Sequence, residues 1–352
     1  MAYDWARGVI VLVGGGDLAN DTWEWQGDTW VLRAVSGPAN RTSHTLAYDS
    51  ARGVTVLFGG LAGHHGLDSE TWEWNGSAWT QRTSAGPSAR GRHAMVYDSV
   101  RNVTVLFGGM NEIFSVISSD TWEWNGTAWT QRQVVGPSAR YGHAMAFDSA
   151  RGVTVLFGGA ATWGSTVNSN SETWEWDGST WTLRAVAGPP RGAVGTMTYD
   201  VARGVTVLFG GIYQANGSHV SDQTWEWNGT AWRRCANIGP NPRYNPASAY
   251  DAGRRTTVLY GGLDSSGNRT ADTWTLNGPA RCPADLDNDG DFANGLARDS
   301  AVTIDDLLAF LSGFETSNAL VDLDNGTNTG TPDGGVDIND LLYFLVHFEA
   351  GC

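Results

Sequence analysis

Alternating aspartates near the end of the 352-residue chain are the side chains best suited to binding a metal ion. Asp285-Leu286-Asp287-Asn288-Asp289-Gly290 places carboxylates at every second position before a glycine, and Asp322-Leu323-Asp324-Asn325-Gly326 repeats the pattern. This spacing gathers hard oxygen ligands around one point, and glycine permits the sharp turn that a Ca²⁺ loop needs. We therefore predict two calcium ions, held by Asp285, Asp287, Asp289, Asp306, Asp322, Asp324, Asp333 and Asp340.

Each aspartate loop precedes an apolar segment with helical spacing. Ile304, Leu307, Leu308 and Phe314 recur 34 positions later as isoleucine, leucine, leucine and phenylalanine. Such spacing predicts a helix with one apolar face, and the sequence contains it twice.

The duplicated loop and helix resembles the dockerin modules. The stretch Cys282-Pro283-Ala284-Asp285 and the final Ala350-Gly351-Cys352 resemble the dockerin variant whose chains end in Gly-Cys. The resemblance implies that residues 282–352 form a small α-helical, EF-hand-like module that binds a cohesin-like protein in a calcium-dependent way. Both loops are longer than the twelve residues of an EF-hand loop. In the first loop, either Asp289 or Asp299 could take the middle position.

The acidity of the chain lies in this tail. The formal net charge is −15, and residues 282–352 hold 14 acidic side chains against one arginine. Without a basic patch, nucleic acid is not an expected partner, and no apolar run has the length of a membrane span. Cys282 and Cys352 bracket the tail, which predicts a disulfide and an oxidising compartment. We expect an extracellular or cell-surface protein, with a signal peptide upstream of Met1.

Six internal repeats occupy the rest of the chain. A Gly-Gly pair ends an apolar run six times, at intervals of 45 to 52 residues, and a Thr-Trp pair follows each one. In the third repeat the pattern predicts four short strands: residues 90–98, residues 103–107, a strand with Trp122 and Trp124, and a strand with Trp129. Asn125-Gly126 predicts a tight primed hairpin turn between the last two strands, because both residues tolerate positive φ.

A four-stranded unit of this size buries both faces only when such units are arranged radially. The strand that ends in Gly-Gly, the later Trp and the Arg-x-x-His motif resemble the kelch family of β-propellers. The expected fold class is an all-β propeller of six four-stranded kelch-like blades in residues 1–281, beside the module in residues 282–352. The first blade is truncated at Met1 and the sixth lacks its last strand. We expect an upstream segment to complete the ring, and a whole repeat there would make seven blades.

Variable segments between the second and third strands of each repeat share one face of such a ring. Loops of this kind carry binding sites, whereas residues repeated in every unit serve packing. We therefore assign to packing the repeated arginines Arg41, Arg90 and Arg140, and the histidine three residues after each of them. Most Trp residues are assigned to packing for the same reason. Cys235 is expected to be a free, half-buried thiol. The candidate binding residues, for which the alternative is an ordinary exposed loop position, are His64, His65, Phe114, Trp163, Tyr213 and His219.

No catalytic residue is predicted. The sequence favours a secreted or surface-anchored binding or scaffold protein. Its propeller loops would contact a protein or a glycan, and its tail would attach it to a cohesin-like partner. The alternative is an extracellular polysaccharide-active enzyme tethered by the same tail. Glu112 and Asp264 are the only variable-loop acids that stand apart from the third strand, and they do not form an evident catalytic pair.

Overall fold

The computed structural model divides the chain into two compact units, Met1–Gly278 and Pro279–Cys352. The structure describes residues 1–14, 20–33, 36–62, 66–82, 84–111, 116–162, 169–184, 188–214, 218–235 and 239–277. The predicted calcium ligands and the pair Cys282 and Cys352 lie outside the described residues. Within the described ranges there is no helix with the length and apolar character of a membrane span.

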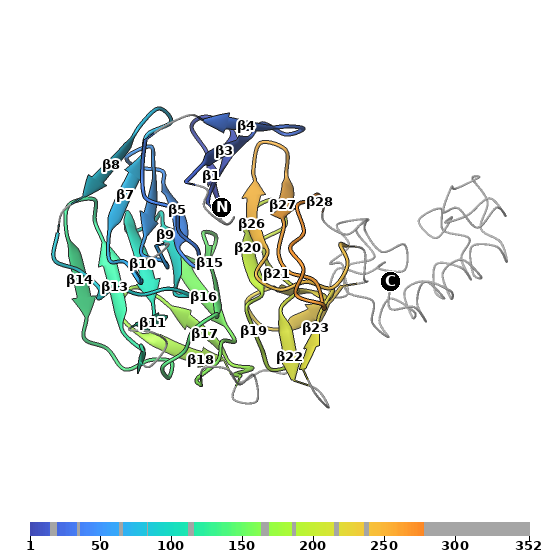
Figure 1. Cartoon of the computed structure of the whole chain (residues 1–352). Helices are drawn as coiled ribbons and strands as arrows, with labels where there is room; N and C mark the ends of the chain where they lie inside the picture. Colours follow the sequence, from blue (N-terminus) through green and yellow to red (C-terminus); the bar gives the residue numbers. More distant parts are fainter. Residues whose placement is uncertain are drawn as a thin grey trace, which may run out of the picture. The chain divides into compact units, whose positions relative to one another are not determined.

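Six antiparallel sheets are arranged around a common centre (Figure 1). The first three sheets, called blades 1 to 3, are built from β1 (Ala2–Asp4), β2 (Val9–Val13), β3 (Thr22–Trp25) and β4 (Trp30–Arg33); β5 (Thr45–Asp49), β6 (Val54–Phe58), β7 (Thr71–Trp74) and β8 (Trp79–Arg82); and β9 (Ala94–Asp98), β10 (Val103–Phe107), β13 (Thr121–Trp124) and β14 (Trp129–Arg132).

Blades 4 and 5 repeat this order and blade 6 stops one strand short. They comprise β15 (Ala144–Asp148), β16 (Val153–Phe157), β17 (Thr173–Trp176) and β18 (Trp181–Arg184); β20 (Thr196–Asp200), β21 (Val205–Phe209), β24 (Thr224–Trp227) and β25 (Trp232–Arg234); and β26 (Ala247–Asp251), β27 (Thr256–Tyr260) and β28 (Thr273–Asn277). Two small sheets lie in the connections, made of β11 (Met110–Asn111) with β12 (Val116–Ile117), and of β19 (Gly192–Ala193), β22 (Ile212–Gln214) and β23 (Ser218–Val220).

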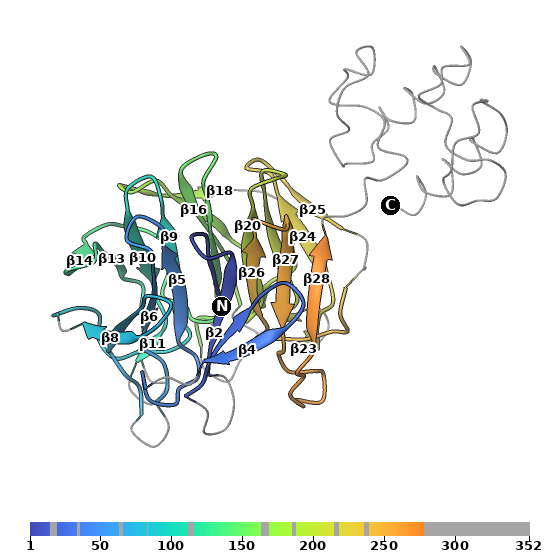
Figure 2. The same ribbon diagram turned by 90° about the horizontal axis from the view of Figure 1, so that it is seen from above.

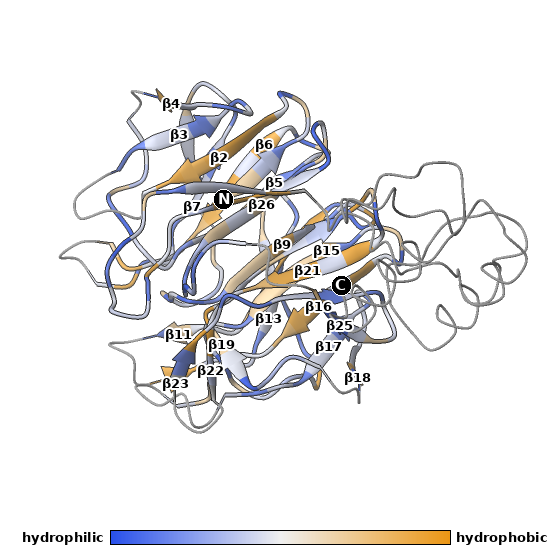
Figure 3. Ribbon diagram, turned by 90° about the vertical axis from the view of Figure 1, so that its right-hand side faces the viewer, coloured by the Kyte–Doolittle hydropathy of each residue, from blue (hydrophilic) through white to orange (hydrophobic). Residues whose placement is uncertain are grey.

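The second strand of each blade is the most apolar because neighbouring blades cover both of its faces. In β6 the residues Val56, Leu57 and Phe58 are fully buried, although successive side chains point to opposite faces. Strands β2 and β21 are correspondingly coloured as hydrophobic in Figure 3. A continuous run of β-branched and aromatic residues, rather than an alternating pattern, is what this two-sided burial requires.

A repeated tryptophan contact joins blades 2 to 5 each to the blade before it. The indole N–H of Trp129, at the start of β14, donates to Thr71 Oγ1 of blade 2 at 2.9 Å. The same ring packs edge-on against Phe58, with centroids 5.1 Å apart. Equivalent indole bonds are Trp79 to Thr22, Trp181 to Thr121 and Trp232 to Thr173. Blades 1 to 4 are thus each fastened by one aromatic anchor from the next blade.

The same contact closes the ring between blade 6 and blade 1. Trp30 donates its indole N–H to Thr273 Oγ1 at 2.8 Å and packs edge-on against Tyr260 at 5.3 Å. The hydroxyl of Tyr3 accepts a hydrogen bond from the backbone N–H of Gly253 at 3.0 Å. Because the two end blades make the contact that the inner ones make, no space is left between them for another blade. The described chain is a β-propeller with six blades.

Blade 6 has three strands within the described residues, which end at Asn277. Figure 2 shows β26, β27 and β28 side by side, with β28 outermost. Trp274 on β28 is 40% exposed, whereas the equivalent Trp72 is partly buried beneath its blade.

The turn between the third and fourth strands differs from the predicted two-residue primed hairpin. Trp124 pairs with Trp129, so four residues form the connection. Only Gly126 has positive φ, at 92°. The Asn125 side chain instead accepts hydrogen bonds at 2.9 Å from the backbone N–H groups of Thr127 and Ala128. The prediction was wrong because the asparagine acts through its side chain rather than through its backbone conformation.

A buried glutamate on the third strand links three elements in most blades. Glu73 accepts from Arg52 at 2.5 Å, from Arg82 at 2.7 Å, and from the indole of Trp124 in the next blade at 3.1 Å. In blade 6 the glutamate is replaced by Thr275, which pairs with Val258 as Glu123 pairs with Val105. Consistently, the buried indole nitrogen of Trp25 in blade 1 has no hydrogen-bond partner.

Changing Thr275→Glu is therefore expected to stabilise the propeller by about 1 kcal/mol, because it offers an acceptor to Trp25 and a counter-charge to Arg254. Urea unfolding of the full chain measures the change. Thr275→Leu is the control, since it adds volume without an acceptor. Equal stability of the two variants would contradict the assignment.

Candidate functional site

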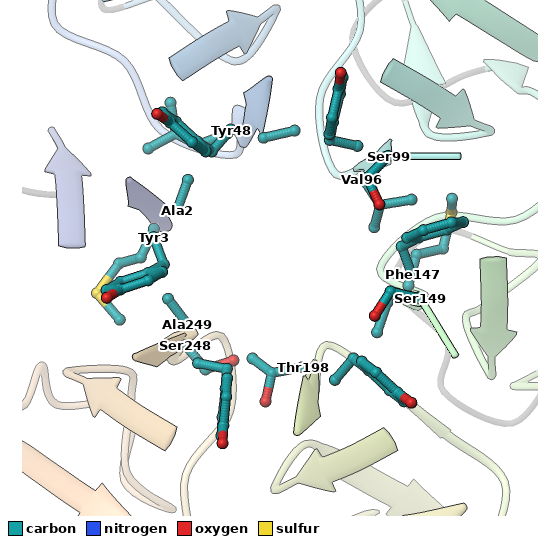
Figure 4. Close-up of a pocket in the computed structure, with 18 of the residues that line it drawn as sticks. Ala2, Tyr3, Tyr48, Val96, Ser99, Phe147, Ser149, Thr198, Ser248 and Ala249 are labelled. Atoms are coloured by element: carbon teal, nitrogen blue, oxygen red, sulfur yellow. The ribbon is translucent and has the colours of Figure 1, made fainter. Parts of the chain in front are cut away.

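The innermost strands surround a central cavity of about 500 Å³. Its deepest ring is formed by thioether and aliphatic side chains, among them Leu46, Met95, Met145 and Met197. Figure 4 shows Ala2, Val96, Thr198 and Ala249 on the next ring, with their short side chains at the inner surface. A pocket of this size that is mostly apolar suits a small ligand or the end of a larger one.

The tyrosines of the following ring turn their hydroxyls away from the cavity. In Figure 4 the oxygen atoms of Tyr3 and Tyr48 point outward, toward the neighbouring blades. The Tyr48 hydroxyl accepts the backbone N–H of Ala6 at 3.3 Å. Burial, with the nearby carboxylate of Asp4, raises the pKa of Tyr48 to about 12. These phenols therefore stay protonated and fasten blades together, so the cavity presents ring faces and not hydroxyls.

The rim of the cavity is formed by the turns that follow the innermost strands. Each turn contains an aspartate that accepts hydrogen bonds from the turn's own backbone and arginine; Asp4 does so with Arg7. The residue after that aspartate faces the cavity. It is serine in three blades and Val201 in blade 5, whereas blade 1 has Trp5. The serines are Ser50, Ser99 and Ser149.

At the position directly after the turn aspartate, Trp5 is the only residue in the described chain that is neither small nor aliphatic. Its side chain is 55% exposed, and it contacts Tyr3 edge-on with ring centroids 5.5 Å apart. Neighbouring repeats do not need a tryptophan here, so packing does not explain it. The sequence analysis did not single out Trp5, because it looked for binding residues only in the variable segments. The residue after the aspartate of each Asp-x-x-Arg turn, Asp4 to Arg7 and its equivalents, was the signal that could have found it.

At the opposite end of the channel, a belt of backbone hydrogen bonds links neighbouring blades. Arg92 N–H donates to Ser43 C=O at 2.9 Å, and Gly142 N–H donates to Arg92 C=O at 2.9 Å. Val194 N–H then donates to Gly142 C=O at 2.6 Å, and Asn245 N–H to Val194 C=O at 2.8 Å. All five residues have φ between 52° and 62°. The belt connects blades 2 to 6 at the variable-loop end, away from Trp5.

Three histidines stand next to this belt, at the start of the innermost strands of blades 2, 3 and 4. His93 Nε2 lies 2.7 Å from Thr45 Oγ1 of the preceding blade. Burial, with Arg41 nearby, lowers the pKa of His44 to about 3, and burial with Arg140 does the same for His143. Burial also lowers the pKa of His93 well below its usual range. The histidines are neutral packing residues at ordinary pH.

The repeated arginines are buried structural donors, as the sequence analysis favoured. Arg90 donates to Gly108 C=O at 3.0 Å and forms a two-pronged ion pair with Asp120 at 2.6 and 2.9 Å. The hydrogen bond from Arg90 outweighs the effect of burial and lowers the pKa of Asp120. Arg41, Arg140 and Arg243 make equivalent bonds to Gly59, Gly158 and Gly261. Their charges are already paired within the blades.

Of the six predicted binding residues, four lie outside the described residues: His64, His65, Phe114 and Trp163. Tyr213 and His219 are paired across β22 and β23. His219 is exposed, but Tyr213 is 6% exposed, with its ring over the backbone of Gly192. Burial raises the pKa of the Tyr213 hydroxyl. The structure therefore places Tyr213 in packing and only His219 at the surface.

No group of three metal-binding side chains is assembled among the described propeller residues. Cys235 is a free cysteine, and it is buried more deeply than expected, at 5% exposure. Burial raises the pKa of its thiol to about 12, so the reactive thiolate is scarce at neutral pH.

Comparison with known proteins supports the fold. No family model matches the chain, and no curated protein matches it. A solved structure described as that of YjhT aligns with 74% of this chain and 89% of its own, at a TM-score of 0.60 and 15% sequence identity. At that identity the likeness shows the fold alone. The class of protein established is a β-propeller with an apolar channel that is open at the turn end.

Proposed function

We propose that this chain is a non-catalytic binding protein whose kelch-like propeller holds a carbohydrate at the turn end of its channel. The observation that carries the proposal is Trp5, a half-exposed aromatic ring at the rim of the cavity with no counterpart in the other blades. A tryptophan offers a flat apolar face and an N–H donor. Ser50 and Ser99 add hydroxyls at the same rim, and a sugar has both apolar C–H faces and hydroxyl groups to match them.

The chemistry of the cavity favours binding over the alternative of polysaccharide cleavage. Glycoside hydrolysis uses two carboxyl groups on either side of the scissile bond. The side chains that line the described cavity are uncharged. The nearest aspartates, in the rim turns, are engaged by arginine and backbone donors, as Asp49 is by Arg52 at 2.7 and 3.0 Å.

Replacing Trp5→Ala is expected to weaken glycan binding about tenfold or more, because the stacking face is lost. A glycan array followed by titration with the best ligand measures the effect. Trp274→Ala is the matched control, since Trp274 is also exposed but lies on the outer edge of blade 6. Equal affinity of the Trp5 variant and the parent, or release of reducing sugar by the parent, would contradict the proposal.

The variable loops and residues 282–352 are also part of the proposal, and their roles are assigned from the sequence. We assign the variable loops to a second face for a protein partner. We assign residues 282–352 to a dockerin-like module that binds two calcium ions and attaches the protein to a cohesin-like partner outside the cell. The support is the alternating aspartates before a duplicated apolar helix, which is the arrangement of paired calcium loops.

Adding Ca²⁺ to the full chain is expected to increase its helical circular dichroism signal and to raise the melting temperature of a transition separate from that of the propeller. The double variant Asp285→Ala/Asp322→Ala is expected to lose both responses. Asp264→Ala, an acid on a propeller loop, is the control and keeps them. An unchanged spectrum at saturating Ca²⁺ would contradict the calcium assignment.

A further inference from the structure

One wall of the central cavity carries hydroxyl-bearing residues where the other walls carry apolar ones. In blades 2 to 5 the second residue of the innermost strand is leucine or methionine, whereas in blade 6 it is Ser248. The third residue is alanine or valine in blades 2, 3, 4 and 6, but Thr198 in blade 5. Both residues line the cavity, and Figure 4 shows them on neighbouring blades at its inner surface.

Ser248 belongs to a pair of hydroxyls that spans the junction of blades 5 and 6. Its Oγ lies 2.5 Å from Oγ1 of Thr196, the first residue of β20. Among the described residues, neither hydroxyl has a second hydrogen-bond partner. Each hydroxyl has one O–H donor and two acceptor lone pairs, and the bond between them uses only one of the two donors. The pair therefore keeps one donor and several lone pairs for a bound molecule.

Packing does not account for a serine at this position. The methionines that replace it in blades 3 to 5 are 6 or 7% exposed. Met145, for example, belongs to one buried apolar cluster with Val105 and Phe107 of the preceding blade. Ser248 lacks that apolar surface and is only half-buried. A residue that departs from the repeat without a gain in packing is typical of a functional position.

Thr198 likewise meets no need that the other blades share. Its Oγ1 lies 3.4 Å from Oγ1 of Thr257 in blade 6. The threonines equivalent to Thr257 in blades 3 to 5 face alanine or valine, and their buried hydroxyls have no partner among the described residues; they are Thr104, Thr154 and Thr206. The fold thus tolerates this threonine without a partner, and Thr198 is not required to satisfy it.

The two hydroxyl-bearing residues and the rim tryptophan lie on three consecutive blades. Blade 6, with Ser248, stands between blade 5, with Thr198, and blade 1, with Trp5. Ala252 follows the turn aspartate of blade 6 as Trp5 follows that of blade 1. Ser248 is four residues before Ala252, or about 13 Å along the innermost strand. A molecule that contacts both Trp5 and Ser248 is therefore longer than a single sugar ring.

We propose, resting on the glycan site of the proposed function, that Ser248 with Thr196 and Thr198 forms an inner subsite for the terminal sugar of a neutral oligosaccharide. The oligosaccharide enters end-on from the turn end of the channel. Its terminal sugar exchanges hydrogen bonds with Ser248 Oγ, and the next sugar stacks on Trp5.

The shape and charge of the cavity set this specificity. The innermost strands surround the cavity, so a long chain cannot lie across it and only a chain end fits (Figure 4). The side chains that line it are uncharged. A carboxylate on the terminal sugar would lose its hydration there without gaining a counter-charge.

The first test is an array of cello-, malto-, xylo- and galacto-oligosaccharides of two to four units, with their uronic-acid-terminated counterparts. We expect the strongest signal from a neutral member. Enzymatic removal of its terminal sugar is expected to abolish binding to the full chain. The methyl glycoside of the terminal sugar alone is expected to bind about tenfold more weakly in titration, because it cannot contact Trp5 and Ser248 together.

Variants of the full chain locate the subsite, with that strongest neutral oligosaccharide as the probe. Ser248→Ala is expected to weaken binding about fivefold, because it removes the hydroxyl and little else. Ser248→Thr restores the hydroxyl and is expected to bind within about twofold of the parent. Ser221→Ala is the matched control: Ser221 is a buried serine that accepts the N–H of Gln223 at 2.9 Å and does not line the cavity. It leaves binding unchanged.

The outcomes separate this inference from the proposed function. If no member of the array binds, both are overturned. If binding is lost in Trp5→Ala but is the same in Ser248→Ala as in the parent, the inner subsite alone is overturned. The inner subsite is also overturned if an acid-terminated oligosaccharide binds best, or if removal of the terminal sugar leaves binding unchanged.

Discussion

Replacing Glu175→Ala will lower the free energy of unfolding by about 3 kcal/mol, which is the scale for breaking a buried ion pair by removing one partner. Glu175 is 2% exposed and accepts from Arg151 at 2.6 Å, from Arg184 at 2.5 Å, and from the Trp227 indole of the next blade at 3.1 Å. The variant leaves a buried indole without its acceptor and two arginines without their counter-charge. Urea unfolding of the full chain measures the loss.

Glu226 is the matched control within the same chain. At the junction of blades 5 and 6, Leu276 stands where the other junctions have the tryptophan that donates to the glutamate. Cys235, three residues after Trp232, stands where blade 4 has Arg184. Its charged partners among the described residues are Arg203 and, at 3.7 Å, Arg233. Glu226→Ala is therefore expected to cost about 1 kcal/mol less than Glu175→Ala. A larger cost at Glu226 would contradict the view that these glutamates act by linking adjacent blades.

Acidification will destabilise the propeller beginning near pH 6.5, well above the range in which carboxylates take up protons. Burial holds the pKa values of His44 and His143 at about 3, against an ordinary value of 6.5. Below pH 6.5 the unfolded chain binds protons that the folded chain does not bind. The contribution of the neutral histidines to the free energy of unfolding is fully present above pH 6.5, and it is lost as the pH decreases toward 3. Each histidine contributes a slope of about 1.4 kcal/mol per pH unit within that window.

The test compares urea unfolding at pH 7.5, 6.5, 5.5 and 4.5 for the parent and for the variant His44→Gln/His93→Gln/His143→Gln. We expect the slope between pH 6.5 and 4.5 to be much smaller in the variant, whatever its stability at pH 7.5. Blades 5 and 6 have Gly195 and Pro246 at the same position, so the fold does not require histidine there. Equal slopes in the two proteins would show that these histidines are accessible to protons.

The architecture could be predicted because the residues that define its strands recur in each repeat. The run Val103–Phe107 forms β10 with the predicted limits, and the tryptophans at β13 and β14 occupy the predicted strands. Repetition makes each position visible six times, so local ambiguity is averaged out.

The candidate site was harder to predict because it depends on residues that do not repeat. Tyr213 lies in a variable segment and was interpreted as a loop residue. Its burial depends on Gly192, which comes from a different connection and leaves room for the ring. The sequence indicated the variable-loop face as the binding face, and this stays a prediction because most of its candidate residues lie outside the described residues. The described cavity adds a second candidate at the opposite end, with its rim at Trp5.

Hydrogen exchange of the full chain, with and without the glycan that binds best on an array, tests whether the glycan binds at the turn end of the channel. We expect the ligand to slow exchange in the rim turns, at Trp5, Ser50 and Ser99, and to leave β22 and β23 unchanged. Protection confined to the variable-loop segments, with no change at the rim turns, would contradict a binding site at the turn end of the channel.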